Sequence, residues 1–111
     1  MTELKLWVDD MRQPPSDKWL WARSVNGAKT VIETYEHRFD IETIIISLDH
    51  DAGDWAKEGG DYIKLLDWLE ERGIVDLGYF FHLHSKNPVG IQNMRVIIEH
   101  NGWREIRGQI S

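Results

Sequence analysis

Apolar side chains recur along the chain with two different spacings. Residues 3–8 alternate polar and apolar positions, and residues 44–48 form a nearly continuous apolar run, and both patterns are typical of strands. Three other segments repeat apolar residues at helical spacing, and Ser24, Asp61 and Asn87 precede them as candidate N-caps. The pattern predicts three helices, each beginning after one of these caps. It also predicts five strands, over residues 3–8, 19–22, 44–48, 79–83 and 103–107.

The order of these elements predicts the fold class. Strands that alternate with helices of roughly 10 to 15 residues need crossover connections, which give a mostly parallel sheet with helices on its faces. The connection between the first two strands is the exception, because Pro14 and Pro15 interrupt any helix there. A length of 111 residues leaves room for a single α/β domain, residues 1–111.

Composition and charge exclude several classes of protein. The chain has no cysteine, which rules out disulfides, thiolate metal sites and a cysteine nucleophile. No apolar run approaches the roughly 20 residues that span a bilayer, and the N-terminus lacks a signal-peptide pattern, so we expect a cytoplasmic protein. The net charge is −6, with twelve acidic and four basic residues in 36–76, which argues against a protein that wraps duplex nucleic acid.

Polar side chains follow three of the predicted strands at their carboxyl ends. Ligands of open parallel sheets bind at this edge, so we expect the side chains to form one site. Asp9, Asp10 and Asp49 are candidate ligands of a divalent metal, Mg²⁺ or Mn²⁺, because clustered carboxylates repel one another unless a cation neutralises them. The alternative is that these carboxylates cap loops by bonding backbone amides.

Neighbouring residues supply candidate acid, base and phosphate-binding groups. His50 and His84 are candidates for general acid and base, since imidazole exchanges protons near neutral pH. Ser85 and Asn87, with the free amides at the start of the helix that follows, form a candidate anion site. Arg12 either contacts a phosphate or balances local acids. His82 is predicted to be structural.

Four strings of residues, LWVDDMRQPP, ISLDHDAG, GGDYIKLLDWLEERG and HSKNPVGIQNM, resemble the motifs of the cyclic-phosphate-processing receiver-like domains. The resemblance implies a receiver or flavodoxin-like three-layer sandwich with strand order 2-1-3-4-5 and helices on both faces. It implies metal binding by Asp9 and Asp10 and places Asp49 at the phospho-acceptor position. The residues particular to this family would be His50, His84, Ser85, Asn87 and Asn93.

The resemblance and the residues together favour one function over two alternatives. We expect a phosphoesterase that acts on a cyclic phosphate of a nucleotide or an RNA end, with an acidic metal site and histidine acid and base. The alternatives are a binding module for a nucleotide or a protein without catalysis, and an atypical phospho-acceptor receiver that uses Asp49. The last is less favoured, because the end of the chain offers Arg104 and Arg107 where an ordinary receiver has a lysine.

Overall fold

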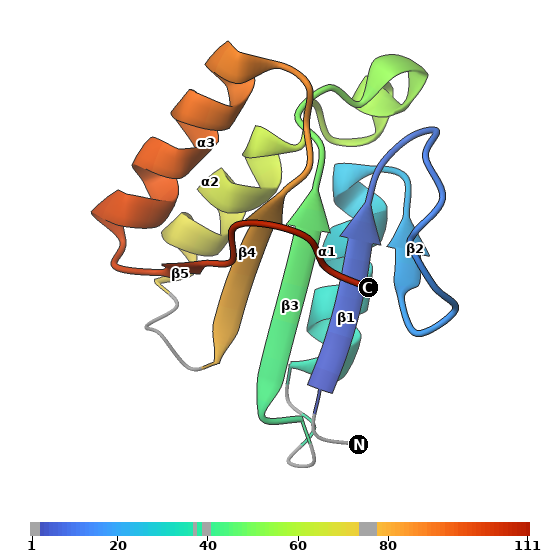
Figure 1. The fold of residues 1–111 in the computed structure, drawn as a ribbon, viewed down its shortest axis with the longest axis vertical. Coiled ribbons are helices and arrows are strands. Elements are labelled where there is room, and N and C mark those ends of the chain that lie inside the picture. Colours follow the sequence, from blue (N-terminus) through green and yellow to red (C-terminus); the bar gives the residue numbers. More distant parts are fainter. Residues whose placement is uncertain (1–2, 37, 39–40, 74–77) are drawn as a thin grey trace.

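Five parallel strands form the centre of the molecule in the order β2-β1-β3-β4-β5 (Figure 1). The structure is a computed structural model that describes residues 3–36, 38, 41–73 and 78–111. Its strands are β1 (Glu3–Val8), β2 (Leu20–Ala22), β3 (Thr43–Leu48), β4 (Tyr79–Leu83) and β5 (Arg104–Glu105). Its helices are α1 (Val25–Tyr35), α2 (Ile63–Glu71), α3 (Pro88–His100) and the short 3-10 helix η1 (Gly53–Glu58). The predicted fold class and strand order are confirmed.

One face of the sheet carries the hydrophobic core. The strand register sets Leu6, Ile46 and Phe81 side by side on this face, and all three are completely buried. The helices α1, α2 and α3 contribute the buried residues Ile32, Leu66 and Met94 and others to the same core cluster. Because every crossover that contains a helix steps along the sheet in one direction, right-handed connections place all three helices on this side.

The opposite face of the sheet is covered without a helix. The register sets Trp7, Ser47 and His82 side by side there, and the ring of Trp19, from the segment after β1, packs edge-on against Trp7. In Figure 1 the C-terminal residues 106–111, drawn in red, cross in front of β4 and β3 towards β1. The resemblance implied a three-layer sandwich with helices on both faces of the sheet. In the described residues, α1, α2 and α3 all lie on one face, because the double proline stands between β1 and β2 in place of a helix and no helix follows β5.

Two of the three predicted helix caps are confirmed. The side chain of Ser24 accepts a hydrogen bond from the amide of Gly27, and that of Asn87 accepts one from Gly90 at the start of α3. The prediction for Asp61 is wrong: its carboxylate accepts from the amide of Ala52 at 3.0 Å, and α2 begins at Ile63 without a side-chain cap. Asp61 therefore secures the loop after β3. Within the described residues, no helix combines the length and the apolar character that crossing a bilayer requires.

Candidate functional site

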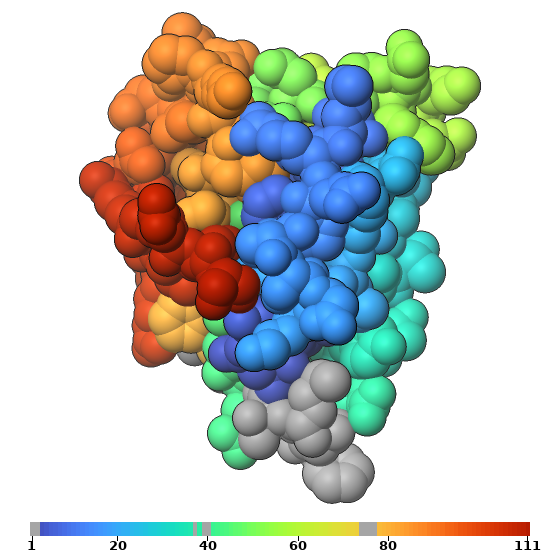
Figure 2. Space-filling view, turned by 45° about the vertical axis from the view of Figure 1, so that its right-hand side comes forward, coloured from blue at the N-terminus to red at the C-terminus, as the bar shows by residue number. Residues whose placement is uncertain are grey.

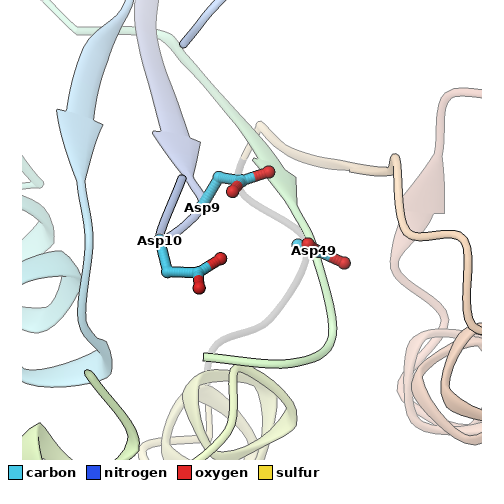
Figure 3. Close-up of side chains that lie close together, drawn as sticks. All are labelled: Asp9, Asp10 and Asp49. Atoms are coloured by element: carbon cyan, nitrogen blue, oxygen red, sulfur yellow. The ribbon is translucent and has the colours of Figure 1, made fainter. Parts of the chain in front are cut away.

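Three carboxylates meet where β1 and β3 end. Val8 and Leu48 are paired in the parallel register, so the residues that follow them, Asp9 with Asp10 and Asp49, leave the sheet side by side. Each offers a carboxylate oxygen, and these oxygens lie within 4.8 Å of one another. Figure 3 shows the Asp9 and Asp10 carboxylates directed from the end of β1 towards Asp49. The structure thus brings together the three acids that the sequence predicted as metal ligands.

Asp9 is the buried member of the cluster and is held at both oxygens. Its side chain is 1% exposed, and Oδ1 accepts hydrogen bonds of 2.9 Å from the amides of Met11 and Arg12. Oδ2 lies 2.8 Å from Nε2 of His84. Burial acts to raise the pKa of Asp9, but the amides and His84 outweigh it, so the pKa falls below its ordinary value. Asp9 is therefore an ionised carboxylate with a fixed orientation.

Asp10 and Asp49 are the accessible members of the cluster. The pKa of Asp10 is raised, first by burial and then by the neighbouring charges of Asp9 and Asp49. This is the mutual repulsion that a bound cation would relieve. Asp49 uses one oxygen to accept the amide of His50 at 2.7 Å. Three clustered oxygen donors, two of them partly exposed, fit a hard divalent cation such as Mg²⁺ or Mn²⁺, which keeps several waters when bound.

Arg12 brings a positive charge to the same place. Its guanidinium lies 3.7 Å from Oδ2 of Asp9 and 3.7 Å from Oδ2 of Asp49, and it donates to the carbonyl of His84 at 3.4 Å. The side chain is 46% exposed, so the guanidinium retains surface for a ligand. Arg12 thus links the ends of β1, β3 and β4 and offsets part of the acidic charge.

A surface cleft of about 350 Å³ opens beside the acids, lined by Arg12, Asp49, Asp51, Ser85, Lys86 and Asn87. Figure 2 shows the segments after β1, β3 and β4, in blue, green and orange, meeting at this end of the molecule. Ser85 accepts the amide of Asn87, and the Asn87 side chain caps α3, so the loop after β4 is ordered by its own hydrogen bonds. Positive and hydrogen-bonding groups at a helix N-terminus favour an anion.

The two candidate histidines have different surroundings. The ring of His84 is stacked on Trp7 with centroids 3.9 Å apart, and both of its nitrogens have partners, Asp9 and the hydroxyl of Ser47. Burial lowers the pKa of His84 despite its acidic neighbours. The ring of His50 is more exposed, at 16% against 8%, and its Nδ1 lies 2.9 Å from Oδ1 of Asp51. Neither imidazole lines the cleft, and of the two His50 is the more exposed and bonds Asp51, which does line it.

The structure gathers most of the predicted site residues but not all of them. Asn93 is exposed in the second turn of α3 and is not among the residues that line the cleft. Sequence reasoning assigned no role to Asp51, which orients His50, or to Ser47, which bonds His84. A signal existed for Ser47, because it is the one polar residue in the apolar run of 44–48.

A comparison with family models matches residues 4–100 to the cyclic-phosphate processing receiver domain. Comparisons with curated proteins and with solved structures give no match. The match covers the acidic cluster, the cleft and the helices α1, η1, α2 and α3.

Proposed function

Since the chain belongs to the family of cyclic-phosphate processing receiver domains, we propose that it is a phosphoesterase that opens a cyclic phosphate of a nucleotide or an RNA end. The observation that supports the proposal is that the acidic cluster adjoins the cleft beside α3. Asp49 belongs to the cluster and also lines the cleft, and Arg12, another lining residue, lies 3.7 Å from the Asp49 carboxylate. A phosphate in the cleft would therefore lie next to a cation held by the acids.

The cleft residues would bind the phosphate. Arg12 and Lys86 supply positive charge, Ser85 supplies a hydroxyl, and the amides that begin α3 point towards the cleft end of the helix. These donors stabilise the charge that grows on the phosphoryl oxygens as a new bond forms.

The acidic cluster would hold the divalent cation. Asp10 and Asp49 have accessible oxygens for it, and Asp9 fixes the geometry from the buried side. When bound, such an ion polarises a phosphoryl oxygen and lowers the pKa of a coordinated water. The charges of Arg12 and a bound divalent cation together would balance the three carboxylates, so the acidic cluster would not repel the phosphate.

His50 would transfer the proton. Asp51 accepts from Nδ1 of His50, which leaves Nε2 as the acceptor for a proton of the attacking water. The water oxygen forms a bond to phosphorus and one ring P–O ester bond breaks. The proton then passes from Nε2 to the leaving oxygen, so the products are a phosphate monoester and a free hydroxyl. His84, whose nitrogens are both engaged, would support Asp9 instead.

Turnover of 2′,3′- and 3′,5′-cyclic nucleotides tests this proposal. Purified protein is incubated with each in Mg²⁺ or Mn²⁺ and in EDTA, and the products are separated by chromatography. We expect hydrolysis of at least one of them that EDTA abolishes, and a roughly 10²-fold or larger loss of rate in His50→Ala. Asn93→Ala is the matched control, since Asn93 lies in the same helix that begins at the cleft but is outside the lining.

Two other results would contradict a phosphoesterase and indicate a different function. Binding of a cyclic nucleotide without product after long incubation would indicate a binding module. Formation of a phosphoryl adduct on Asp49 from acetyl phosphate, detected by intact mass and absent in Asp49→Asn, would indicate a phospho-acceptor receiver.

A further inference from the structure

A chain of four hydrogen bonds crosses the helix-free face of the sheet. It begins at Oδ2 of Asp9, which lies 2.8 Å from Nε2 of His84. Nδ1 of His84 and Nδ1 of His82 each lie 2.8 Å from the hydroxyl of Ser47, which stands between them on β3. The chain ends at the carbonyl of Gly108, 2.8 Å from Nε2 of His82. It therefore connects the acidic cluster with the C-terminal segment.

The chemistry of the two ends fixes the direction of the outer bonds. A backbone carbonyl only accepts, so Nε2 of His82 carries a proton and donates it to Gly108. An ionised carboxylate also only accepts, so Nε2 of His84 donates to Asp9. These two rings are thus held in one orientation each, with Nδ1 facing inward.

The hydroxyl of Ser47 joins the inner edges of the two rings. It lies 2.8 Å from Nδ1 of His82 and 2.8 Å from Nδ1 of His84, so both rings contact the same side-chain oxygen.

We propose that Ser47 and His82 are positioning residues for the acidic cluster. Stacking on Trp7 fixes the plane of the His84 ring but not the direction of its edges within that plane. The hydroxyl of Ser47 supplies the missing constraint, because it bonds Nδ1 and so turns Nε2 towards Asp9. His82, tied to Gly108, holds the hydroxyl of Ser47 in place. Residues outside the cleft thus orient the buried carboxylate of the cluster.

Nuclear magnetic resonance of protein with ¹⁵N-labelled histidine tests this inference directly. The protein is measured in EDTA, without substrate, so the result does not depend on phosphoesterase activity. In the wild type we expect both rings to carry a proton at Nε2, the nitrogen that faces the carbonyl of Gly108 in His82 and the carboxylate of Asp9 in His84. Either ring unprotonated at Nε2 would overturn the inference.

Variants of β3 separate positioning from a structural effect. Ser47→Ala removes the shared hydroxyl, and we expect the ring nitrogen signals of both His82 and His84 to shift. Ser47→Thr keeps the hydroxyl and should restore the wild-type signals. Ile45→Val, on the same face of the same strand, is the matched control and should leave them unchanged. Unchanged signals in a folded Ser47→Ala variant would contradict the proposal. If that variant does not fold, the wild-type spectrum still decides.

Discussion

Gly90→Ala tests how the first turn of α3 and the loop after β3 fit together. Gly90 is the third residue of α3 and is buried, and the ring of His50 lies against its Cα. A Cβ at this position would stand 2.4 Å from Cγ and 2.6 Å from Cδ2 of His50. These distances are well below contact, so the substitution must displace the imidazole that we assign to proton transfer.

Two opposing terms set the size of the effect. Overpacking a well-filled site costs about 1–3 kcal/mol, while alanine in place of glycine inside a helix gains about 1 kcal/mol. We therefore expect Gly90→Ala to lower the free energy of unfolding by about 0–2 kcal/mol in the wild type. In a His50→Ala background the ring is gone and only the Cβ of residue 50, at 2.9 Å, still crowds the new methyl group, so the same substitution should lower the free energy of unfolding by less than in the wild type.

Urea denaturation of the four proteins in this double-mutant cycle measures the coupling. Gly27→Ala provides a matched control, because Gly27 is the third residue of α1 after the cap Ser24. A Cβ there meets Oγ of Ser24 at 3.1 Å and no ring, so it should cost less than Gly90→Ala. If Gly90→Ala is equally destabilising with and without His50, the packing argument is refuted.

Three further changes test the electrostatics and the caps. Ser24→Ala removes the hydroxyl that accepts the amide of α1 and should cost about 1 kcal/mol of stability, measured by thermal or urea unfolding. Glu105→Gln removes the charge of the carboxylate that accepts two hydrogen bonds from Arg95, the interaction that lowers the pKa of Glu105 most, and leaves one side-chain oxygen to accept. A lowered pKa stabilises the fold above the ordinary value of 4.5, so the variant should be about 1 kcal/mol less stable at neutral pH, and this deficit should shrink below that pH. Equal deficits at pH 7 and pH 3.5 would refute this. Asp10 has a raised pKa, so its charge opposes folding above 3.8, and Asp10→Asn should raise the melting temperature in EDTA. Added Mg²⁺ should stabilise the wild type more than this variant, and equal stabilisation would count against the metal site.

The sheet was predictable from the sequence because its signals are local. Alternation in 3–8 and the apolar run in 44–48 correspond to β1 and β3, and Asn87 before Pro88 marks the start of α3. Asp61 shows the limit of such reasoning. A carboxylate before a helical pattern is a good cap by type, but the amide of Ala52, nine residues earlier, competes for it, and only the folded loop shows this.

The site was predictable in its residue types and less so in their roles. Parallel strands bring their carboxyl ends to one edge, so the meeting of Asp9, Asp10 and Asp49 followed from their positions along the chain. The different roles of His50 and His84 could not be predicted from their positions along the chain. They depend on Trp7 and Ser47, which the sheet register brings next to His84 although they are far from it in sequence.

The proposed reaction itself can be followed by ³¹P nuclear magnetic resonance of a 2′,3′-cyclic nucleotide during incubation with the purified protein and Mg²⁺. We expect the cyclic phosphate resonance to be replaced by that of a phosphate monoester. EDTA or Asp49→Asn should stop the conversion, while Asn93→Ala should leave it unchanged. A cyclic phosphate that persists with the wild type, with 2′,3′- and with 3′,5′-substrates and with either Mg²⁺ or Mn²⁺, would contradict the proposed phosphoesterase function.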